Sequence, residues 1–205
     1  MKLKDAQKYY YNIQISSGSP PNGPGSLDSF ILKEGTIDYI NQIIDKYNIE
    51  NINDCPSGVY GNWIHLLKLP QRGINYVGYD INDLIVERNK TEYPSIEFVE
   101  FDMTKQVPPK GDLIICRDAL FHLPNEMVIQ SLNNFKESGS TYLLATEQWW
   151  LKENYELTQK ELDMGCGYRP INLEITPFFL GKPLETHIEN DGIDEGRNIG
   201  LWKIN

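Results

Sequence analysis

The chain has 205 residues, 40% of them hydrophobic, which suffices for one α/β domain with its own core but not for two. Its formal net charge of −10 and the lack of clustered Lys and Arg argue against a nucleic-acid ligand and favour a small molecule. The three cysteines include no C-x-x-C pair, which predicts reduced thiols without a disulfide framework or a metal site. The sequence also has no long apolar run and no apolar signal-peptide core, so we expect a cytoplasmic protein without a membrane span.

Residues 1–27 are predicted to form an N-terminal cover segment, followed by the main domain at 28–205. Residues 1–14 carry three lysines and a run of three tyrosines that ends at Tyr11, so we expect a short helix whose tyrosines either pack or cover a ring-shaped surface. Residues 16–26 are rich in Ser, Pro and Gly and predict a loop. The loop is either a flexible linker or a lid that keeps water from a reacting centre.

The first helix of the main domain is expected to begin after Asp28 or Ser29, since either side chain can cap it. Its apolar residues recur at three- and four-residue spacing and predict one face toward a sheet. These residues are Ile31, Ile37, Ile40, Ile43, Ile44 and Tyr47.

Residues 51–63 predict a short strand that passes through a glycine turn into a helix at 61–68. Gly58 has no Cβ and tolerates a positive φ, so a nucleoside could approach the backbone there. The first amides of the helix would point at the same place. The alternative is a plain strand-to-helix turn without a ligand.

Three further predicted strands, at 75–80, 96–102 and 112–118, each end in an aspartate. An acid such as Asp80, at the end of the second strand, can accept hydrogen bonds from both ribose hydroxyls of a nucleoside. Each aspartate alone is equally consistent with an Asx turn or a helix cap. Their shared position favours a cleft at one edge of the sheet.

The remaining sequence continues the alternation, with helices predicted at 84–93 and 125–136 and a strand at 141–146, which indicates a parallel sheet covered on both faces. Residues 148–176 break the pattern and are expected to cap the cleft. Strands at 184–188 and 198–204 are joined by a short turn, so they must be antiparallel.

Together, Asp54-x-Pro-Ser-Gly58, Asp80, Asp102 and Cys116-Arg-Asp-Ala-Leu-Phe-His-Leu-Pro124 resemble class I S-adenosylmethionine-dependent methyltransferases. The chain is similar to a small bacterial group of these enzymes with Asp-x-Pro-Cys-Gly, Cys-Arg-Asp and Arg-Pro-x-Asn-Leu segments. The resemblance implies an α/β, Rossmann-like doubly wound sheet of seven strands, mostly parallel, with a reversed C-terminal strand. The sequence departs from the family pattern in two ways. Pro56-x-Gly58-x-Tyr60 stands in place of the usual Gly-x-Gly-x-Gly, and Gly61 comes one position later than a family glycine.

The resemblance also implies S-adenosyl-L-methionine as cofactor, with its methionine portion at Asp54 and Gly58, its ribose at Asp80 and its adenine amine at Asp102 and Met103. The full set of implied cofactor-binding residues is Asp54, Pro56, Gly58, Asp80, Ile81, Asp102, Met103 and Arg117.

On the acceptor side, the catalytic candidates are His122, Asp118 and Arg117. His122 is either the base for a hydroxyl acceptor or a helix-capping or packing histidine. Arg117 is either a site residue or the partner of a salt bridge to Asp118 or Asp80.

The substrate-binding candidates are Tyr11, Trp149, Arg169 and Asn172. Arginines suit a phosphate or carboxylate and the aromatic residues suit a sugar or another ring, so the expected acceptor is an oxygen of a sugar-like or phosphorylated metabolite. An acceptor that is already ionised would need no base. The enzyme is expected to be a monomer or homodimer.

Two other functions remain open from the sequence. A nucleotide-dependent oxidoreductase shares the turn and the ribose acid, but the hairpin ending and the absent G-x-G-x-x-G disfavour it. A methyltransferase-like subunit that binds the cofactor without catalysis is the second alternative.

Overall fold

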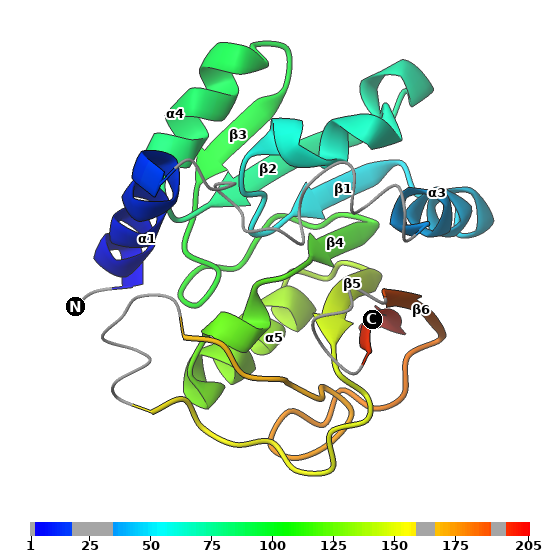
Figure 1. Cartoon of the computed structure of the whole chain (residues 1–205). Coiled ribbons are helices and arrows are strands. Elements are labelled where there is room, and N and C mark those ends of the chain that lie inside the picture. Colours follow the sequence, from blue (N-terminus) through cyan, green and yellow to red (C-terminus); the bar gives the residue numbers. More distant parts are fainter. Residues whose placement is uncertain (1–2, 18–34, 159–166, 190–195) are drawn as a thin grey trace.

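The computed structural model describes residues 3–17, 35–158, 167–189 and 196–205 (Figure 1). Its α-helices are α1 Leu3–Ser17, α3 Thr36–Lys46, α4 Asp83–Glu92 and α5 Asn125–Glu137. Its strands are β1 Asn51–Asp54, β2 Asn75–Asp80, β3 Glu97–Glu100, β4 Leu113–Cys116, β5 Tyr142–Glu147, β6 Glu185–Glu189 and β7 Arg197–Lys203. Short 3-10 turns are η2 Tyr60–Asn62, η3 Ile64–Leu67, η4 Pro70–Arg72 and η5 Leu120–His122.

All seven strands form one sheet in the order β3-β2-β1-β4-β5-β7-β6. Strands β1 to β5 are parallel, and β7 lies antiparallel between β5 and β6. The predicted fold class, a mostly parallel seven-stranded sheet with a reversed C-terminal strand, is therefore confirmed. So is the predicted antiparallel pairing of the last two strands.

The two faces of the sheet carry separate apolar clusters, because neighbouring residues along a strand point to opposite sides. One cluster joins the buried isoleucines of α3 and Val86 of α4 to strand residues such as Ile52 and Ile115. The other joins Val128, Leu132 and Phe135 of α5 to the opposite sides of the same strands. Helices thus cover both faces, as expected for a doubly wound sheet.

The predicted α-helix at 61–68 is wrong. This region forms two 3-10 turns, η2 and η3, separated by Trp63 at φ −158° and ψ −35°, values that end a helical path. Ile64 and Leu67 are buried three residues apart, a spacing that a 3-10 turn also puts on one side. Turns of three and four residues have no appreciable helix dipole, so no helical amides point at a ligand here, contrary to the expectation from the sequence.

The N-terminal helix is confirmed and extends to Ser17. Helix α3 begins after Gly35, which has a left-handed φ of 72°. The proposed caps Asp28 and Ser29, most of the 16–26 loop and Cys166 lie outside the described residues. Within the described ranges, no helix has both the length and the apolarity to cross a membrane.

Candidate functional site

The strand order reverses between β1 and β4, because the chain adds β2 and β3 on one side of β1 and then β4 and β5 on the other. In open α/β sheets, ligands bind at the carboxyl ends of the strands at such a switch point. Asp54 ends β1, and the Cys55 amide then donates to the Ile115 carbonyl of β4 across 2.7 Å. Cys116 ends β4 and is followed by Arg117. These residues mark the edge at which a ligand is expected.

Asp80, at the end of β2, is bound to the glycine turn. Its Oδ2 accepts a hydrogen bond from the Gly58 amide at 3.0 Å, and its Oδ1 accepts one from the Asn82 amide at 2.8 Å. Burial raises the pKa of Asp80 to about 6, although the two amide hydrogen bonds oppose the shift. Each oxygen retains acceptor capacity for a hydroxyl. Ile81 follows and is half-buried.

Asp54, at the end of β1, is buried near Asp80. Its Oδ2 accepts a hydrogen bond of 2.7 Å from the Tyr76 hydroxyl. Burial raises the pKa of Asp54 to about 7, while the Tyr76 bond and the positive charge of Arg117 lower it and the negative charge of Asp80 raises it further. Asp54, Asp80 and Arg117 are therefore close enough to interact electrostatically, as the sequence predicted for residues at adjoining strand ends.

The glycine turn is held by a residue that sequence reasoning missed. Gly58 has a φ of 55° and lies two residues after the half-buried Pro56. Asn89, on α4, donates to the Gly58 carbonyl at 2.7 Å and accepts from the Tyr60 amide at 3.1 Å. Nothing in the sequence distinguishes this asparagine from those that cap helices on the surface.

Asp102 forms the Asx turn that was its alternative interpretation. Its Oδ1 accepts hydrogen bonds from the Thr104 amide and hydroxyl at 3.0 and 2.6 Å, and its Oδ2 pairs with Lys105 at 2.6 Å. The Met103 carbonyl accepts from Asn134 at 2.8 Å. The turn fixes the backbone at 102–104 at the carboxyl end of β3, where an adenine contact was predicted.

Arg117 lies in a buried ion cluster. Its guanidinium pairs with Asp118 at 2.8 Å and with both oxygens of Glu189 at 3.0 and 3.1 Å. It also lies 5.4 Å from the centre of the Trp63 ring, within the range of a cation–π contact. The salt bridge to Asp118, one of the two interpretations of Arg117, is thus present.

Glu189, at the end of β6, organises this cluster and was not predicted. It also pairs with Arg197 at 3.1 Å and accepts a hydrogen bond of 2.5 Å from Thr36 of α3. Arg197 reaches Asp118 at 3.4 Å, so two arginines and two carboxylates balance one another. All four side chains are at most 12% exposed.

His122 lies in η5, beyond the end of β4. Its Nδ1 is 2.5 Å from the Gly167 carbonyl oxygen, so Nδ1 carries the proton and Nε2 carries the lone pair. The ring packs edge-on against Phe121 and lies 6.1 Å from the Tyr168 ring. Burial lowers the pKa of His122 below its ordinary value, which keeps the imidazole neutral at neutral pH.

Arg169 is fully buried and anchors the segment after residue 167. Its guanidinium donates to the carbonyls of Tyr155 and Leu123, both at 2.7 Å, and to the Asn125 side chain at 2.6 Å. These partners favour a structural role over the predicted contact with an acceptor, because buried carbonyl groups need such donors.

The Asn172 side chain is also bound to backbone groups. Its side chain donates to the carbonyls of Trp149 and Leu151 at 3.1 and 2.9 Å and accepts from the Glu174 amide at 2.9 Å. The Trp149 side chain is 51% exposed and remains available to a ligand.

Helix α1 lies next to α4 (Figure 1). Lys4 contacts Glu100 at the end of β3, and Lys8 pairs with Asp83 at 2.7 Å. The helix is therefore attached at the carboxyl ends of β2 and β3, the side where the strand-end acids lie. Tyr11 is half-buried on this helix.

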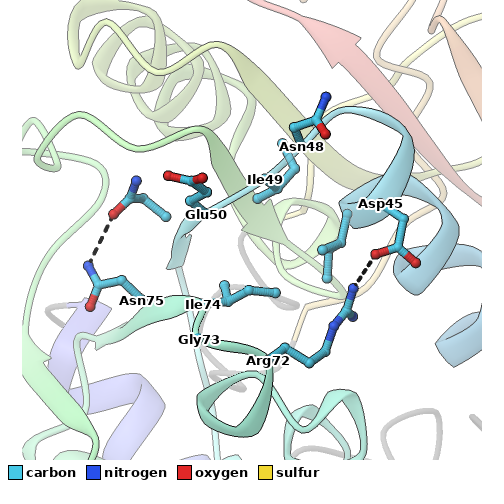
Figure 2. Close-up of a pocket in the computed structure, with 10 residues that line it drawn as sticks. Asp45, Asn48, Ile49, Glu50, Arg72, Gly73, Ile74 and Asn75 are labelled. Atoms are coloured by element: carbon cyan, nitrogen blue, oxygen red, sulfur yellow. Dashed lines mark hydrogen bonds and ion pairs between the residues drawn. The ribbon is translucent and has the colours of Figure 1, made fainter.

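A groove at the opposite edge of the sheet contains none of the predicted site residues (Figure 2). Its lining comes from the end of α3 and the starts of β1 and β2, and it includes an ion pair of 2.5 Å between Arg72 and Asp45. Polar and charged side chains make up most of the groove's lining, and Ile49 and Ile74 are among its few apolar residues. The groove lies at the amino ends of β1 and β2 rather than at the switch point.

No protein-family model and no curated protein sequence matches the chain. Among solved structures, magnesium protoporphyrin IX methyltransferase from Synechocystis PCC 6803 with bound S-adenosylmethionine has a TM-score of 0.66 and 16% identity over 99% of this chain and 98% of that chain. N-methyltransferase NodS from Bradyrhizobium japonicum WM9, in complex with S-adenosylhomocysteine, has a TM-score of 0.64 and 12% identity over 95% and 97%. The chain has the fold of class I S-adenosylmethionine-dependent methyltransferases.

Human N-acetylserotonin methyltransferase in complex with S-adenosylmethionine has a TM-score of 0.54 and 15% identity, over 98% of this chain and 65% of that chain. These similar proteins include an N-methyltransferase, so the fold alone does not specify the acceptor atom. Among the residues with described positions, no group of three His, Cys, Asp or Glu side chains is arranged to hold a metal ion.

Proposed function

We propose that the protein is an S-adenosylmethionine-dependent methyltransferase that acts on a small-molecule acceptor. The observation that carries this proposal is the hydrogen bond between Asp80, which ends β2, and Gly58, which follows β1 on the side of the sheet where the carboxyl ends of the strands lie. It joins an acid suited to ribose hydroxyls to a turn whose central residue has no Cβ and a left-handed φ. Two solved structures that match this chain over at least 95% of both chains contain S-adenosylmethionine or S-adenosylhomocysteine.

The residues present fit this cofactor. Asp80 and Ile81 would hold the ribose, and the backbone at Asp102 and Met103 would meet the adenine. The remaining proposed cofactor contacts are Asp54, Pro56 and Gly58, for the methionine portion. Arg117, which the resemblance also implied, is not included, because its buried guanidinium is already paired with Asp118 and Glu189. When bound, the cofactor supplies a methyl group activated by a sulfonium centre.

A nucleotide-dependent oxidoreductase is the less favoured function. Strand β7 lies antiparallel between β5 and β6, whereas the dinucleotide-binding fold continues with parallel βαβ units. The turn at 56–60 also lacks the G-x-G-x-x-G sequence.

In the proposed reaction, the chain mainly aligns the acceptor, because alignment supplies much of the rate of a bimolecular transfer. His122 would accept the proton of a hydroxyl at Nε2, since its Nδ1 donates to Gly167. The lowered pKa of the His122 imidazole supports this role, because the neutral form is the base. Arg117 and Asp118 would hold the neighbouring backbone at the end of β4.

A neutral sugar-like or other ring-bearing acceptor is favoured over a phosphorylated one. Arg117 and Arg197 are balanced by Asp118 and Glu189, and Arg169 is bound to backbone carbonyls, so these guanidiniums have little capacity for a phosphate. The exposed Trp149 and Tyr168 rings can stack on a sugar or another ring instead.

Calorimetric titration tests the cofactor part of this proposal. S-adenosylhomocysteine is expected to bind and NAD is not, whereas NAD binding alone would favour the oxidoreductase. A panel of neutral ring-bearing alcohols, each paired with its phosphorylated analogue, then tests the acceptor by transfer of a labelled methyl group. Cofactor binding without transfer to any member would favour the non-catalytic subunit.

A further inference from the structure

The Asn89 side chain uses both ends of its amide on the glycine turn. Asn89 is fully buried on α4, nine positions after Asp80 in the sequence. Its Nδ2 donates to the Gly58 carbonyl at 2.7 Å, and its Oδ1 accepts from the Tyr60 amide at 3.1 Å. Only an amide side chain has a donor and an acceptor on one short planar group, so no other residue of this length could make both bonds.

Gly58 is therefore held at both of its backbone polar groups. Its N–H donates to Asp80 and its C=O accepts from Asn89, so the peptide groups on either side of Gly58 cannot rotate without losing a partly buried hydrogen bond. Gly58 is in the left-handed region at φ 55°, a conformation that glycine adopts at no steric cost but does not favour strongly over others. The two side-chain bonds select this conformation before any ligand arrives.

The residues between Asp80 and Asn89 form a continuous connection. The Asp80 carboxylate accepts from the Asn82 amide, and the Asn82 side chain caps α4 by accepting from the Leu84 amide at 3.1 Å. Helix α4 then carries Asn89 back to the glycine turn. The end of β2, the cap of α4 and the turn are thus closed into one hydrogen-bonded unit.

We propose that Asn89 is a positioning residue that presets the Gly58–Tyr60 turn for the amino-acid portion of the cofactor. The inference rests on the proposed function, in which Asp80 holds the ribose and the turn meets the methionine portion. A preset turn lowers the conformational cost of binding, because the backbone is already ordered. The contribution should appear in the affinity for ligands that have the amino-acid portion and be absent from ligands that lack it.

Two ligands separate this role from a general effect on the fold. S-adenosylhomocysteine has both the nucleoside and the amino-acid portion, whereas 5′-methylthioadenosine has the nucleoside alone. The Asn89→Leu variant keeps the approximate volume of the side chain but loses both hydrogen bonds. Calorimetry should show affinity for S-adenosylhomocysteine reduced by about tenfold or more, and affinity for 5′-methylthioadenosine unchanged within about twofold.

The amides of Gly58 and Tyr60 should also exchange with solvent faster in Asn89→Leu without ligand, since their local structure loses its tether. Lys90→Ala is the matched control, because Lys90 is exposed on the same helix and pairs only with Glu87 among the contacts described for it. If Asn89→Leu does not fold, Asn89→Asp, which keeps the side-chain shape and loses the bond to the Gly58 carbonyl, takes its place.

An equal loss of affinity for both ligands would overturn the positioning role and leave a structural one. Unchanged affinity for S-adenosylhomocysteine would also overturn it. If the parent protein bound neither ligand, the proposed function itself would fail, and this outcome is visible before any variant is made.

Discussion

The Asp80 carboxylate and the Gly58 amide are joined by a hydrogen bond of 3.0 Å between residues 22 positions apart. One side chain thus belongs to the proposed ribose site and also holds the turn proposed for the methionine portion. Its loss should affect both parts of the cofactor site. A residue that only contacted the ribose would have a smaller effect.

Asp80→Ala should weaken S-adenosylhomocysteine binding by about 1.5–3 kcal/mol, because hydrogen bonds to a charged acceptor contribute about that much. Isothermal titration calorimetry measures the change. Glu97→Ala, on the exposed side of the neighbouring strand, is the control and should bind as the parent does. Binding by Asp80→Ala as tight as that of the parent would show that this strand end does not hold the cofactor.

Asp54→Asn should stabilise the protein at pH 8. Burial gives the Asp54 carboxyl a pKa of about 7, above its ordinary 3.8, so the folded state binds the proton more tightly than the unfolded chain. This contribution favours folding below pH 4, is lost progressively as the pH rises to about 7, and is absent above it. Asparagine keeps the acceptor for Tyr76 and avoids the buried charge.

Thermal unfolding followed from pH 4 to pH 8 tests this expectation. The melting temperature of Asp54→Asn should match the parent at pH 4 and exceed it at pH 8, by about 2–4 °C for each kcal/mol of relief. A lower melting temperature at pH 8 would mean that the ionised carboxylate is held by partners in the folded state, and the assignment of its pKa would be wrong.

Binding of S-adenosylhomocysteine should weaken as the pH falls through 6. The pKa of Asp80 is raised to about 6, so its ionised form decreases by about tenfold between pH 7 and pH 5. A protonated carboxyl is a poorer acceptor for ribose hydroxyls. Titrations at pH 5, 6, 7 and 8 should show this loss in the parent and little change in Asp80→Asn, which is neutral throughout. A pH profile shared by both proteins would assign the titration to another group.

The sequence predicts the carboxyl end of β2 well because the information is local, whereas the strands predicted at 96–102 and 112–118 end two residues earlier, at Glu100 and Cys116. The apolar run that ends at Asp80 identifies both a buried strand and its carboxyl edge, and parallel strands bring those edges together. The helix at 61–68 was predicted wrongly because apolar spacing alone cannot separate an α-helix from 3-10 turns. The break at Trp63 depends on the packing of the whole segment.

Two important residues of the site could not be found from the sequence. Glu189 meets Arg117 across 72 positions and Thr36 across 153, so only the completed sheet brings them together. Asn89 looks like any polar residue in the middle of a helix, and its role depends on how α4 packs on the glycine turn. Both residues satisfy long-range contacts that no local pattern records.

Arg169→Lys should lower the free energy of unfolding by about 2–4 kcal/mol, because a lysine cannot reach all the buried carbonyls that Arg169 now satisfies. Chemical denaturation measures the change. Arg72→Lys, which affects an ion pair at the surface, should change stability by less than about 0.5 kcal/mol. If Arg169→Lys were as stable as the parent but had a higher KM for the acceptor, Arg169 would instead be an acceptor-binding residue, as the sequence first suggested.

His122→Ala should lower the rate of methyl transfer by about 10²–10⁴-fold if the acceptor is a hydroxyl, because a positioned base is lost. Affinity for S-adenosylhomocysteine should not change, since His122 lies beyond β4 rather than at the glycine turn. Single-turnover kinetics with the identified acceptor measures the rate. His187→Ala is the control and should keep the parent's rate, because His187 packs on Tyr39 of α3, with ring centroids 5.0 Å apart, and is not a proposed site residue.

The pH dependence of this variant separates a base from a packing histidine. In the parent, burial lowers the pKa of His122, so the neutral base already prevails at neutral pH and the rate should be constant from there upward. In His122→Ala, the residual rate should keep rising with pH as the acceptor hydroxyl ionises by itself. A uniform loss at every pH, accompanied by a lower melting temperature, would instead assign His122 to the packing of Phe121 and Tyr168. A rate near that of the parent would favour an acceptor that is already ionised and needs no base.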